Sequence, residues 1–215
     1  MNTANRRACR RWLALIGSCV LVIAVVHASP PTPSGAQLLK ALRQGGYVLV
    51  MRHANSPFTT PDKSVAEPAN AKLERQLDET GRNTAQAMGE AMRHLHIPFG
   101  EILSSPTYRA LETLRIALLG NAETVSELDE PPQGMQADAG STRSAWLRHK
   151  VAERPRAGTN TLIVTHTPNI MSAFGESAAG IAAGETLVFW PDGHGSAELA
   201  ARIKIEEWPR LEMAK

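Results

Sequence analysis

Two histidines and two arginines in this sequence have the types and positions that phosphate chemistry requires. Arg52 and His53 directly follow a run of apolar residues. His166 directly follows a second such run, and Arg109 lies a few residues beyond a third, shorter one. A neutral imidazole nitrogen is a nucleophile near neutral pH, and a guanidinium offers a planar pair of donors to phosphate oxygens. The four side chains together therefore indicate a phosphate site, although each alone is more often structural or solvated.

Helices alternate with apolar strands along the chain, and this alternation predicts how the four side chains meet. Residues 47–51 and 161–165 are continuous apolar runs, typical of parallel strands that are covered on both faces. Further strands are expected at residues 101–103 and 186–190, and an alternating edge strand at 199–205. Helices are expected around residues 38–42, from a cap at Thr80 to Pro98, from Pro106 to Gly120, and over residues 141–153.

The predicted fold class is α/β, a three-layer α/β/α sandwich with a mostly parallel sheet. Ligands in such sheets bind just beyond the carboxyl ends of the strands. The two histidines and two arginines all follow strands, so we expect them to converge on one edge of the sheet. The irregular regions 54–79 and 121–145 are expected to flank this edge and to determine which substrate binds.

The blocks that contain these residues resemble the histidine phosphatase superfamily, which is also called phosphoglycerate mutase-like. Residues 47–53 resemble its R-H-G signature, and residues 103–113 resemble its S-S-P-x-x-R-A-x-x-T block. Residues 77–87 are similar to its L-x-x-x-G-x-x-Q-A helix start, and residues 161–166 to the strand that carries its second histidine. The blocks occur in the family order and cover most of residues 45–192.

The resemblance implies a role for each of the four side chains. His53 would accept the phosphoryl group and form a phosphohistidine, with its other ring nitrogen fixed by a backbone carbonyl. Arg52 and Arg109 would hold the phosphate oxygens. His166 would act as a further donor, cationic if protonated, and would take part in catalysis. The activity implied is that of a histidine acid-type phosphatase, a phosphoric monoester hydrolase, which needs no metal and no cofactor.

The proton donor for the leaving oxygen is expected in an acidic stretch. The resemblance points to Glu130, which lies in a segment similar to the family's L-x-E-x-x-x-G stretch, while Glu127 and Asp129 remain as competitors. Asn55, two residues after His53, is a further candidate for phosphate binding. Ala54 stands where the family usually has glycine, so a methyl group is expected to crowd the backbone beside the nucleophile.

The first 28 residues have the anatomy of a secretory signal peptide. Four arginines precede an apolar run of about 15 residues, which ends in small residues suited to cleavage after Ala28. An uncleaved N-terminal membrane anchor is the alternative, and either would place the domain outside the cytoplasm, in the periplasm or secreted. Both cysteines, Cys9 and Cys19, lie in this segment. Residues 29–215 are then expected to form a single histidine phosphatase domain without a membrane span.

Removing the four arginines from the 23 basic residues leaves 19 against 21 acidic residues, a net charge of −2. The domain also lacks the basic stripe that a nucleic-acid partner would require. The expected partner is a small phosphorylated substrate, whose identity the sequence does not specify, and neither does it specify the oligomeric state.

Two other functions fit parts of the sequence. A metal-dependent hydrolase could use His94 and His96, whose spacing resembles that of metal ligands, together with His53 and His166. However, His94 and His96 fall at the end of a predicted helix, where positive groups suit the helix dipole. A protein of the same fold could also bind a phosphate ligand without catalysis, but the presence of both histidines, both arginines and an acid favours an enzyme.

Overall fold

The computed structural model describes residues 35–58, 72–131 and 138–211, so the predicted signal peptide lies outside the described residues. Their helices, 3₁₀ turns and strands follow in the order α1 (Gly35–Gln44), β1 (Val48–Arg52), α2 (Glu79–His94), β2 (Phe99–Ser104), α3 (Tyr108–Ala117), β3 (Glu123–Thr124), η2 (Ser126–Leu128), α4 (Thr142–Ala152), β4 (Asn160–Thr165), α5 (Thr167–Phe174), η3 (Gly175–Ala178), β5 (Thr186–Pro191), β6 (Ala197–Ile203), η4 (Ile205–Glu207) and α6 (Trp208–Leu211). None of the helices in these ranges is long and apolar enough to cross a membrane.

The strands form one six-stranded sheet in the order β3-β2-β4-β1-β5-β6. The first four of these run parallel to one another, which confirms the predicted α/β class with a mostly parallel sheet. β5 runs antiparallel to β1, and β6 antiparallel to β5. The reversal at β5 follows from its entry point, because the backbone N–H of Gly184 bonds to the carbonyl of His53 at 3.0 Å. The chain therefore enters β5 beside the carboxyl end of β1 and runs back along it.

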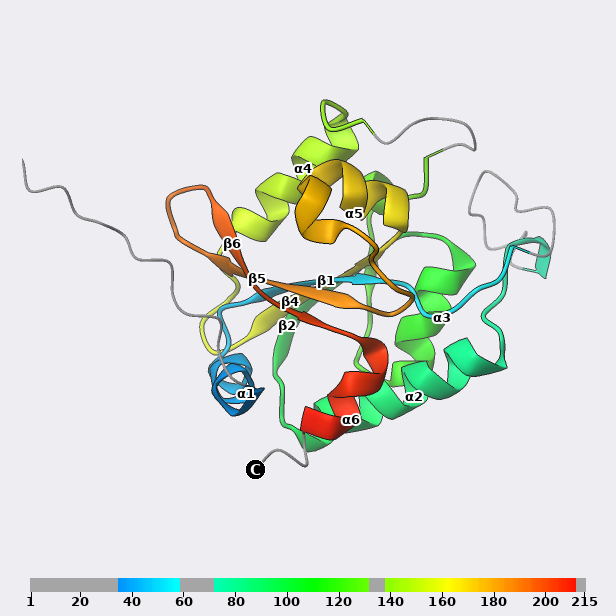
Figure 1. The fold of residues 1–215 in the computed structure, drawn as a ribbon, viewed down its shortest axis with the longest axis horizontal. Helices are drawn as coiled ribbons and strands as arrows, with labels where there is room; N and C mark the ends of the chain where they lie inside the picture. The colour runs from blue at the N-terminus through cyan, green and yellow to red at the C-terminus, as the bar shows by residue number, and fades with distance from the viewer. Residues whose placement is uncertain (1–34, 59–71, 132–137, 212–215) are drawn as a thin grey trace, which may run out of the picture. The chain divides into compact units, whose positions relative to one another are not determined.

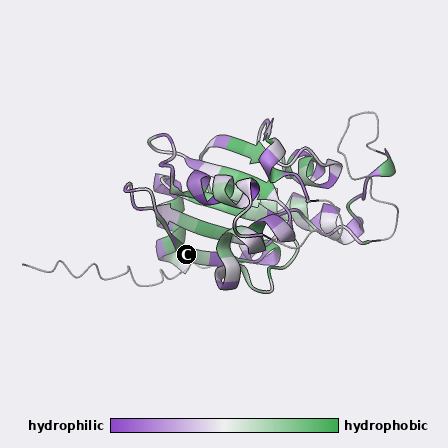
Figure 2. Ribbon diagram, turned by 90° about the horizontal axis from the view of Figure 1, so that it is seen from above, coloured by the Kyte–Doolittle hydropathy of each residue, from purple (hydrophilic) through white to green (hydrophobic). Residues whose placement is uncertain are grey.

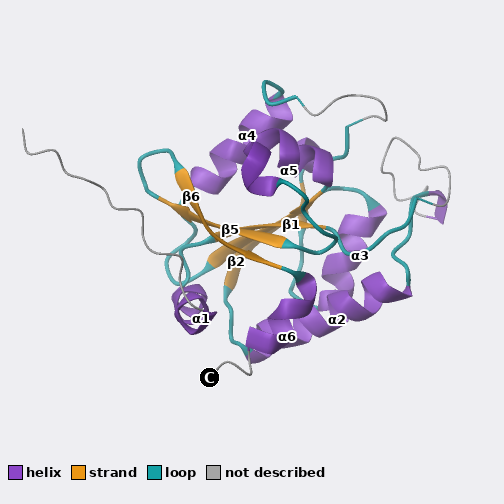
Figure 3. Cartoon of the chain, in the orientation of Figure 1, coloured by secondary structure: helices purple, strands orange, loops and turns teal. Residues whose placement is uncertain are grey.

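Helices cover both faces of the sheet, as expected for a three-layer sandwich. Figures 1 and 3 show α4 and α5 on one face and α1, α2, α3 and α6 on the other. Side chains of β1 alternate between the two cores, with Val48 and Val50 facing one and Leu49 and Met51 facing the other, all fully buried. Figure 2 accordingly shows hydrophobic residues gathered in the strands.

The boundaries of two helices differ from prediction for local reasons. The cap of α2 is Asp78, not Thr80, because the Asp78 carboxylate accepts a hydrogen bond from the Gly81 N–H at 2.7 Å. α3 begins at Tyr108 rather than at Pro106, since Thr107 has an extended backbone, and it ends at Ala117, where Leu118 turns left-handed with φ 52°.

The region predicted to be a loop after α3 contains regular structure. β3 adds a two-residue strand beside β2, and the 3₁₀ turn η2 that follows buries Leu128 completely. Both residues of β3 are exposed and polar, so no hydrophobic pattern marked this strand. At the other edge, β6 ends at Ile203, and Ile205 begins the turn η4 instead of continuing the predicted strand.

Candidate active site

His53 lies directly after β1, at the carboxyl edge of the sheet, and only 2% of it is exposed. Its Nδ1 is 2.8 Å from the carbonyl oxygen of Ala54, so Nδ1–H donates to this oxygen and Nε2 keeps its lone pair. Burial, followed by the positive charges of Arg109, Arg52 and Arg75, lowers the pKa of His53 to about 3. His53 is therefore neutral around neutral pH, as a nitrogen nucleophile must be.

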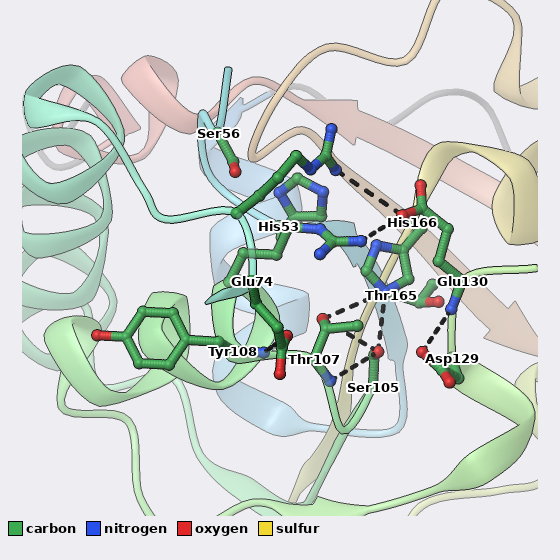
Figure 4. Close-up of polar contacts among 12 residues, drawn as sticks. His53, Ser56, Glu74, Ser105, Thr107, Tyr108, Asp129, Glu130, Thr165 and His166 are labelled. Atoms are coloured by element: carbon green, nitrogen blue, oxygen red, sulfur yellow. Dashed lines mark hydrogen bonds and ion pairs between the residues drawn. The ribbon is translucent and has the colours of Figure 1, made fainter. Parts of the chain in front are cut away.

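His166 lies beside His53, at the start of α5 and directly after β4. The two rings meet edge to face, with 5.2 Å between their centroids. The Nε2 of His166 is 2.8 Å from the hydroxyl of Ser105 and 3.4 Å from that of Thr107, as the dashed lines in Figure 4 show. Its Nδ1 is buried and has no hydrogen-bond partner among the described residues. If Ser105 donates to Nε2, Nδ1 carries the proton and is a donor for a bound oxygen.

His166 was predicted to be a cationic donor if it is protonated, but its surroundings in the structure disfavour the protonated form. Burial, and then the neighbouring His53 and arginines, lower the pKa of His166 well below its usual value. The imidazole is therefore neutral in this structure. A phosphate dianion beside it would offset the arginine charges and favour the protonated form.

The two predicted arginines both lie beside His53. Arg109, in the first turn of α3, is 1% exposed, and its Nη2 donates to the carboxylate of Glu130. The Nη1 of Arg52 donates to the carbonyl of Ile181 at 3.0 Å, and burial lowers the pKa of Arg52. Each of the two guanidinium groups is close enough to lower the pKa of His53. The structure thus brings together the four side chains that the sequence singled out.

A third arginine, Arg75, belongs to the same cluster and was missed in the sequence. It is 4% exposed, its Nη2 lies 3.8 Å from Glu130, and its guanidinium stacks over the ring of Phe58 at 4.0 Å. Its charge also lowers the pKa of both His53 and His166. The available signal was its place in region 54–79, which was expected to flank the site.

Of the three candidate acids, Glu130 contacts two arginines of the cluster. Its carboxylate pairs with Arg109, and its side chain is 24% exposed. The Asp129 carboxylate instead accepts the backbone N–H of Glu130 at 2.8 Å. Glu127 accepts from the hydroxyl of Ser126 at 2.9 Å, in an exposed position. Glu130, the residue predicted as the acid, thus lies beside the arginines, and its role as proton donor stays a prediction.

Buried side chains from the sheet and from α5 hold the chain just before Glu130. The Nδ2 of Asn169 donates to the carbonyls of Glu127 and Asp129, at 3.3 and 3.0 Å. The hydroxyl of Thr165 donates to the carbonyl of Leu128 at 2.7 Å. Three successive carbonyls are thus tied to the segment that carries His166. Nothing in the sequence pattern marked Asn169 for this position.

Asn55 does not join the arginine cluster. Its Nδ2 donates to the carboxylate of Asp78 at 2.6 Å, and its carbonyl accepts the N–H of Asp78 at 3.2 Å. Asn55 thereby joins the chain after His53 to the start of α2, where Gly81 approaches so closely that a Cβ would lie 2.2 Å from the Asn55 oxygen. This arrangement gives Asn55 a structural contact and does not support the predicted phosphate contact.

Ala54 fits its position without strain. Its methyl group is fully buried in the core, and its N–H donates to the hydroxyl of Thr113 at 3.1 Å. Ala54 does not have the positive φ that would favour glycine. The predicted crowding of the backbone is therefore not observed.

His94 and His96 lie at the other end of α2 from the site. The helix has 16 residues. At 1.5 Å per residue it extends about 24 Å from the Asp78 cap. The two histidines are therefore not brought to His53 and His166. Within the described ranges, no group of three or more histidine, cysteine, aspartate or glutamate side chains is placed to hold a metal ion.

The fold is an α/β sandwich whose site contains two histidines and a cluster of arginines, and comparison with known proteins shows what it is similar to. Residues 48–131 match the family model of the histidine phosphatase superfamily (branch 1). This match and the fold support assignment to that superfamily. A search of curated proteins gave no match.

Solved structures share the phosphoglycerate mutase-like fold at low sequence identity. One is the protein histidine phosphatase SixA complexed with tungstate, which is 22% identical over 75% of this chain and 98% of its own, with a TM-score of 0.55. A phosphoserine phosphatase mutant from Entamoeba histolytica in complex with phosphoserine is 13% identical over 74% and 98%, with a TM-score of 0.55. YhfR of Bacillus stearothermophilus is 17% identical over 72% and 95%, with a TM-score of 0.51. At these identities the likeness shows the fold alone.

Proposed function

We propose that this protein is a phosphatase that hydrolyses small phosphate monoesters through a phosphohistidine formed on His53. The match of residues 48–131 to the superfamily model supports a phosphatase activity. The observation that carries the finer proposal is the state of His53. Its Nδ1–H is committed to the Ala54 carbonyl, and burial together with nearby guanidinium charge keeps the ring neutral, which leaves the Nε2 lone pair for attack.

In the first half of the reaction, Nε2 of His53 attacks phosphorus and the bond to the leaving oxygen breaks. Glu130, in its acid form, donates its proton to that oxygen, so the alcohol leaves neutral. Arg52 and Arg109 donate to the non-bridging oxygens, over which charge is spread in the transition state. Arg75 is a third guanidinium for the same oxygens or for the rest of the substrate.

In the second half, Glu130 acts as a base. Its carboxylate takes a proton from a water molecule while the water oxygen attacks the phosphohistidine, and the P–N bond breaks. Inorganic phosphate leaves, His53 regains its lone pair and Glu130 regains its proton. No metal, cofactor or nucleic acid takes part in this scheme.

We also propose that the protein acts outside the cytoplasm, in the periplasm or secreted. The basis is the sequence of residues 1–28, with its arginine-rich start, short apolar run and small residues at the end. Fractionation of cells that express the tagged full chain tests this proposal, and recovery of the protein in the cytoplasm at its full mass would contradict it.

The enzymatic proposal is tested with the purified protein and p-nitrophenyl phosphate. His53→Ala should abolish turnover, while the same change at the exposed His149 should leave it unaltered. Rapid quenching of wild-type enzyme in alkaline denaturant, in which a phosphohistidine survives, should trap phosphate on His53, and mass spectrometry would locate it. Full turnover by His53→Ala would refute the mechanism. If the wild type binds phosphate without turnover, the protein is a non-catalytic phosphate-binding protein. If EDTA abolishes activity and zinc restores the activity, the protein is a metal-dependent hydrolase.

A further inference from the structure

Arg75 lies in a segment without regular structure, and its position therefore requires an anchor. A short 3₁₀ turn at residues 72–73 is followed by irregular chain up to the Asp78 cap of α2. Arg75 is nevertheless buried beside the histidines and Glu130. An arginine on an irregular segment binds an anion well only if the segment is held in place, because ordering it on binding would cost free energy.

We propose that Glu74 is a positioning residue that holds Arg75 in the phosphate site. The inference rests on the proposed function, in which the site binds a phosphoryl group. The Glu74 side chain is 4% exposed, although it carries a carboxylate. Its Oε2 accepts a hydrogen bond from the backbone N–H of Tyr108 at 2.6 Å, and Figure 4 shows this contact beside Thr107.

The hydrogen bond with Tyr108 places the Glu74 carboxylate at the start of a helix, where a negative charge is stabilised. Tyr108 is the first residue of α3, and the first N–H groups of a helix have no partner within the helix. A carboxylate is stabilised there by the hydrogen bond and by the helix dipole. The side chain of Thr107, the cap residue of α3, forms no capping hydrogen bond. Glu74, from a distant part of the chain, therefore takes this place.

The same helix start carries the other parts of the site. Arg109 directly follows Tyr108, and the hydroxyl of Thr107 lies 3.4 Å from His166. Glu74 thus ties the segment of Arg75 to the element that places Arg109 and supports His166. Together with the Glu130 carboxylate, which contacts both arginines, this anchor helps to set the distance between Arg75 and Arg109 that a phosphate bridging them requires.

Further contacts steady the segment around Arg75. The hydroxyl of Ser56 donates to the carbonyl of Gln76 at 2.9 Å, and the Gln76 amide donates to the carbonyl of Glu74 at 2.9 Å. The ring of Phe58 covers one face of the Arg75 guanidinium. These contacts hold the chain on either side, but the Glu74 carboxylate is the charged group that reaches α3.

The test is a double-mutant cycle on Glu74 and Arg75, read by binding of inorganic phosphate in calorimetry and by KM and kcat. Arg75→Ala should weaken phosphate binding by about 10–100-fold, the range for a lost charged hydrogen bond. Glu74→Ala should weaken binding in the same direction by at least about fivefold, and in the Arg75→Ala background it should add less than about twofold. Glu74→Gln keeps an acceptor oxygen for Tyr108 and should restore most of the binding.

The matched control is Glu79→Ala, which removes an exposed carboxylate from the first turn of α2 and should leave binding unchanged. Additive effects of the Glu74 and Arg75 changes would overturn the proposal, as would wild-type binding by Glu74→Ala. A loss of kcat in Glu74→Gln with unchanged phosphate binding would make Glu74 a catalytic acid and not a positioning residue. Because the cycle is read by binding, it remains informative even if wild-type turnover fails and the proposed function falls.

Discussion

The neutral state of His53 makes a prediction about stability as well as about chemistry. The pKa of His53 is about 3 in the folded protein, against 6.5 for an unperturbed histidine. Below pH 6.5 the unfolded chain therefore binds a proton that the folded chain does not. The stability contributed by neutral His53 is complete above this pH and is lost as the pH falls from 6.5 towards 3. His166, whose pKa is also lowered, acts in the same direction.

The size of the effect follows from the two pKa values of His53. At about pH 5 the unfolded imidazole is almost fully protonated and the folded one is not, which lowers the free energy of unfolding by about 2 kcal/mol relative to about pH 7.5. His53→Gln removes this titration and keeps a polar side chain. Between about pH 7.5 and about pH 5, the stability of His53→Gln relative to wild type should therefore rise by about 2 kcal/mol.

Urea unfolding at the two pH values, in a buffer without phosphate, measures this difference. The matched control is Asn121→Gln, at an exposed position, which removes no titrating group and should change the free energy of unfolding equally at both pH values. The difference in midpoint, multiplied by a common m-value, gives the stability change directly. If wild type and His53→Gln respond identically to pH, His53 titrates alike in the folded and unfolded chains. His53 would then not be a neutral, buried nucleophile.

Three further predictions test other parts of the site and its frame. Arg109→Ala should lower kcat/KM by about 10²–10³, and Arg109→Lys should recover little of it because a lysine lacks the planar fork; steady-state kinetics decide this. Asn169→Ala should slow hydrolysis of an alkyl phosphate much more than that of p-nitrophenyl phosphate, because only the poor alkyl leaving group needs the acid. Glu130→Gln should show the same pattern. Equal losses on both esters would contradict the role of Asn169 in placing Glu130. Gly81→Ala should destabilise the fold by about 1–3 kcal/mol in urea unfolding, because its Cβ would meet the Asn55 carbonyl; an unchanged midpoint would contradict this close approach.

The strands that place the histidines were predictable because strands buried on both faces are continuous apolar runs in the sequence. β1 and β4 lie in the middle of the sheet, and their residues are apolar or buried almost throughout. Once both are recognised as parallel strands, the meeting of His53 and His166 follows from the rule that carboxyl ends share an edge. The strand that reverses, β5, carries the same apolar signal, so composition did not reveal its direction.

The residues that were missed depend on contacts between distant segments. Glu74 and Arg75 are charged and lie in an irregular stretch, where sequence patterns favour exposure, yet both are 4% exposed. Their burial becomes intelligible only when the start of α3 and the carboxylate of Glu130 are in place beside them. Asn169 is similar, since the carbonyls that it binds belong to a turn about 40 residues away in the chain.

The positive charge of the arginine cluster affects His53 before a phosphate binds and His166 after it binds. Before substrate binds, Arg52, Arg75 and Arg109 help to lower the pKa of His53, so the nitrogen that attacks in the proposed mechanism stays unprotonated even in mildly acidic solution. A bound phosphate dianion would neutralise part of that positive charge, which would favour a proton on His166 and add a cationic donor for the phosphoryl oxygens. The nucleophile keeps its lone pair because its other nitrogen is tied to the Ala54 carbonyl. The two histidines therefore need different charges in the complex, and their different hydrogen-bond partners provide the means to separate them.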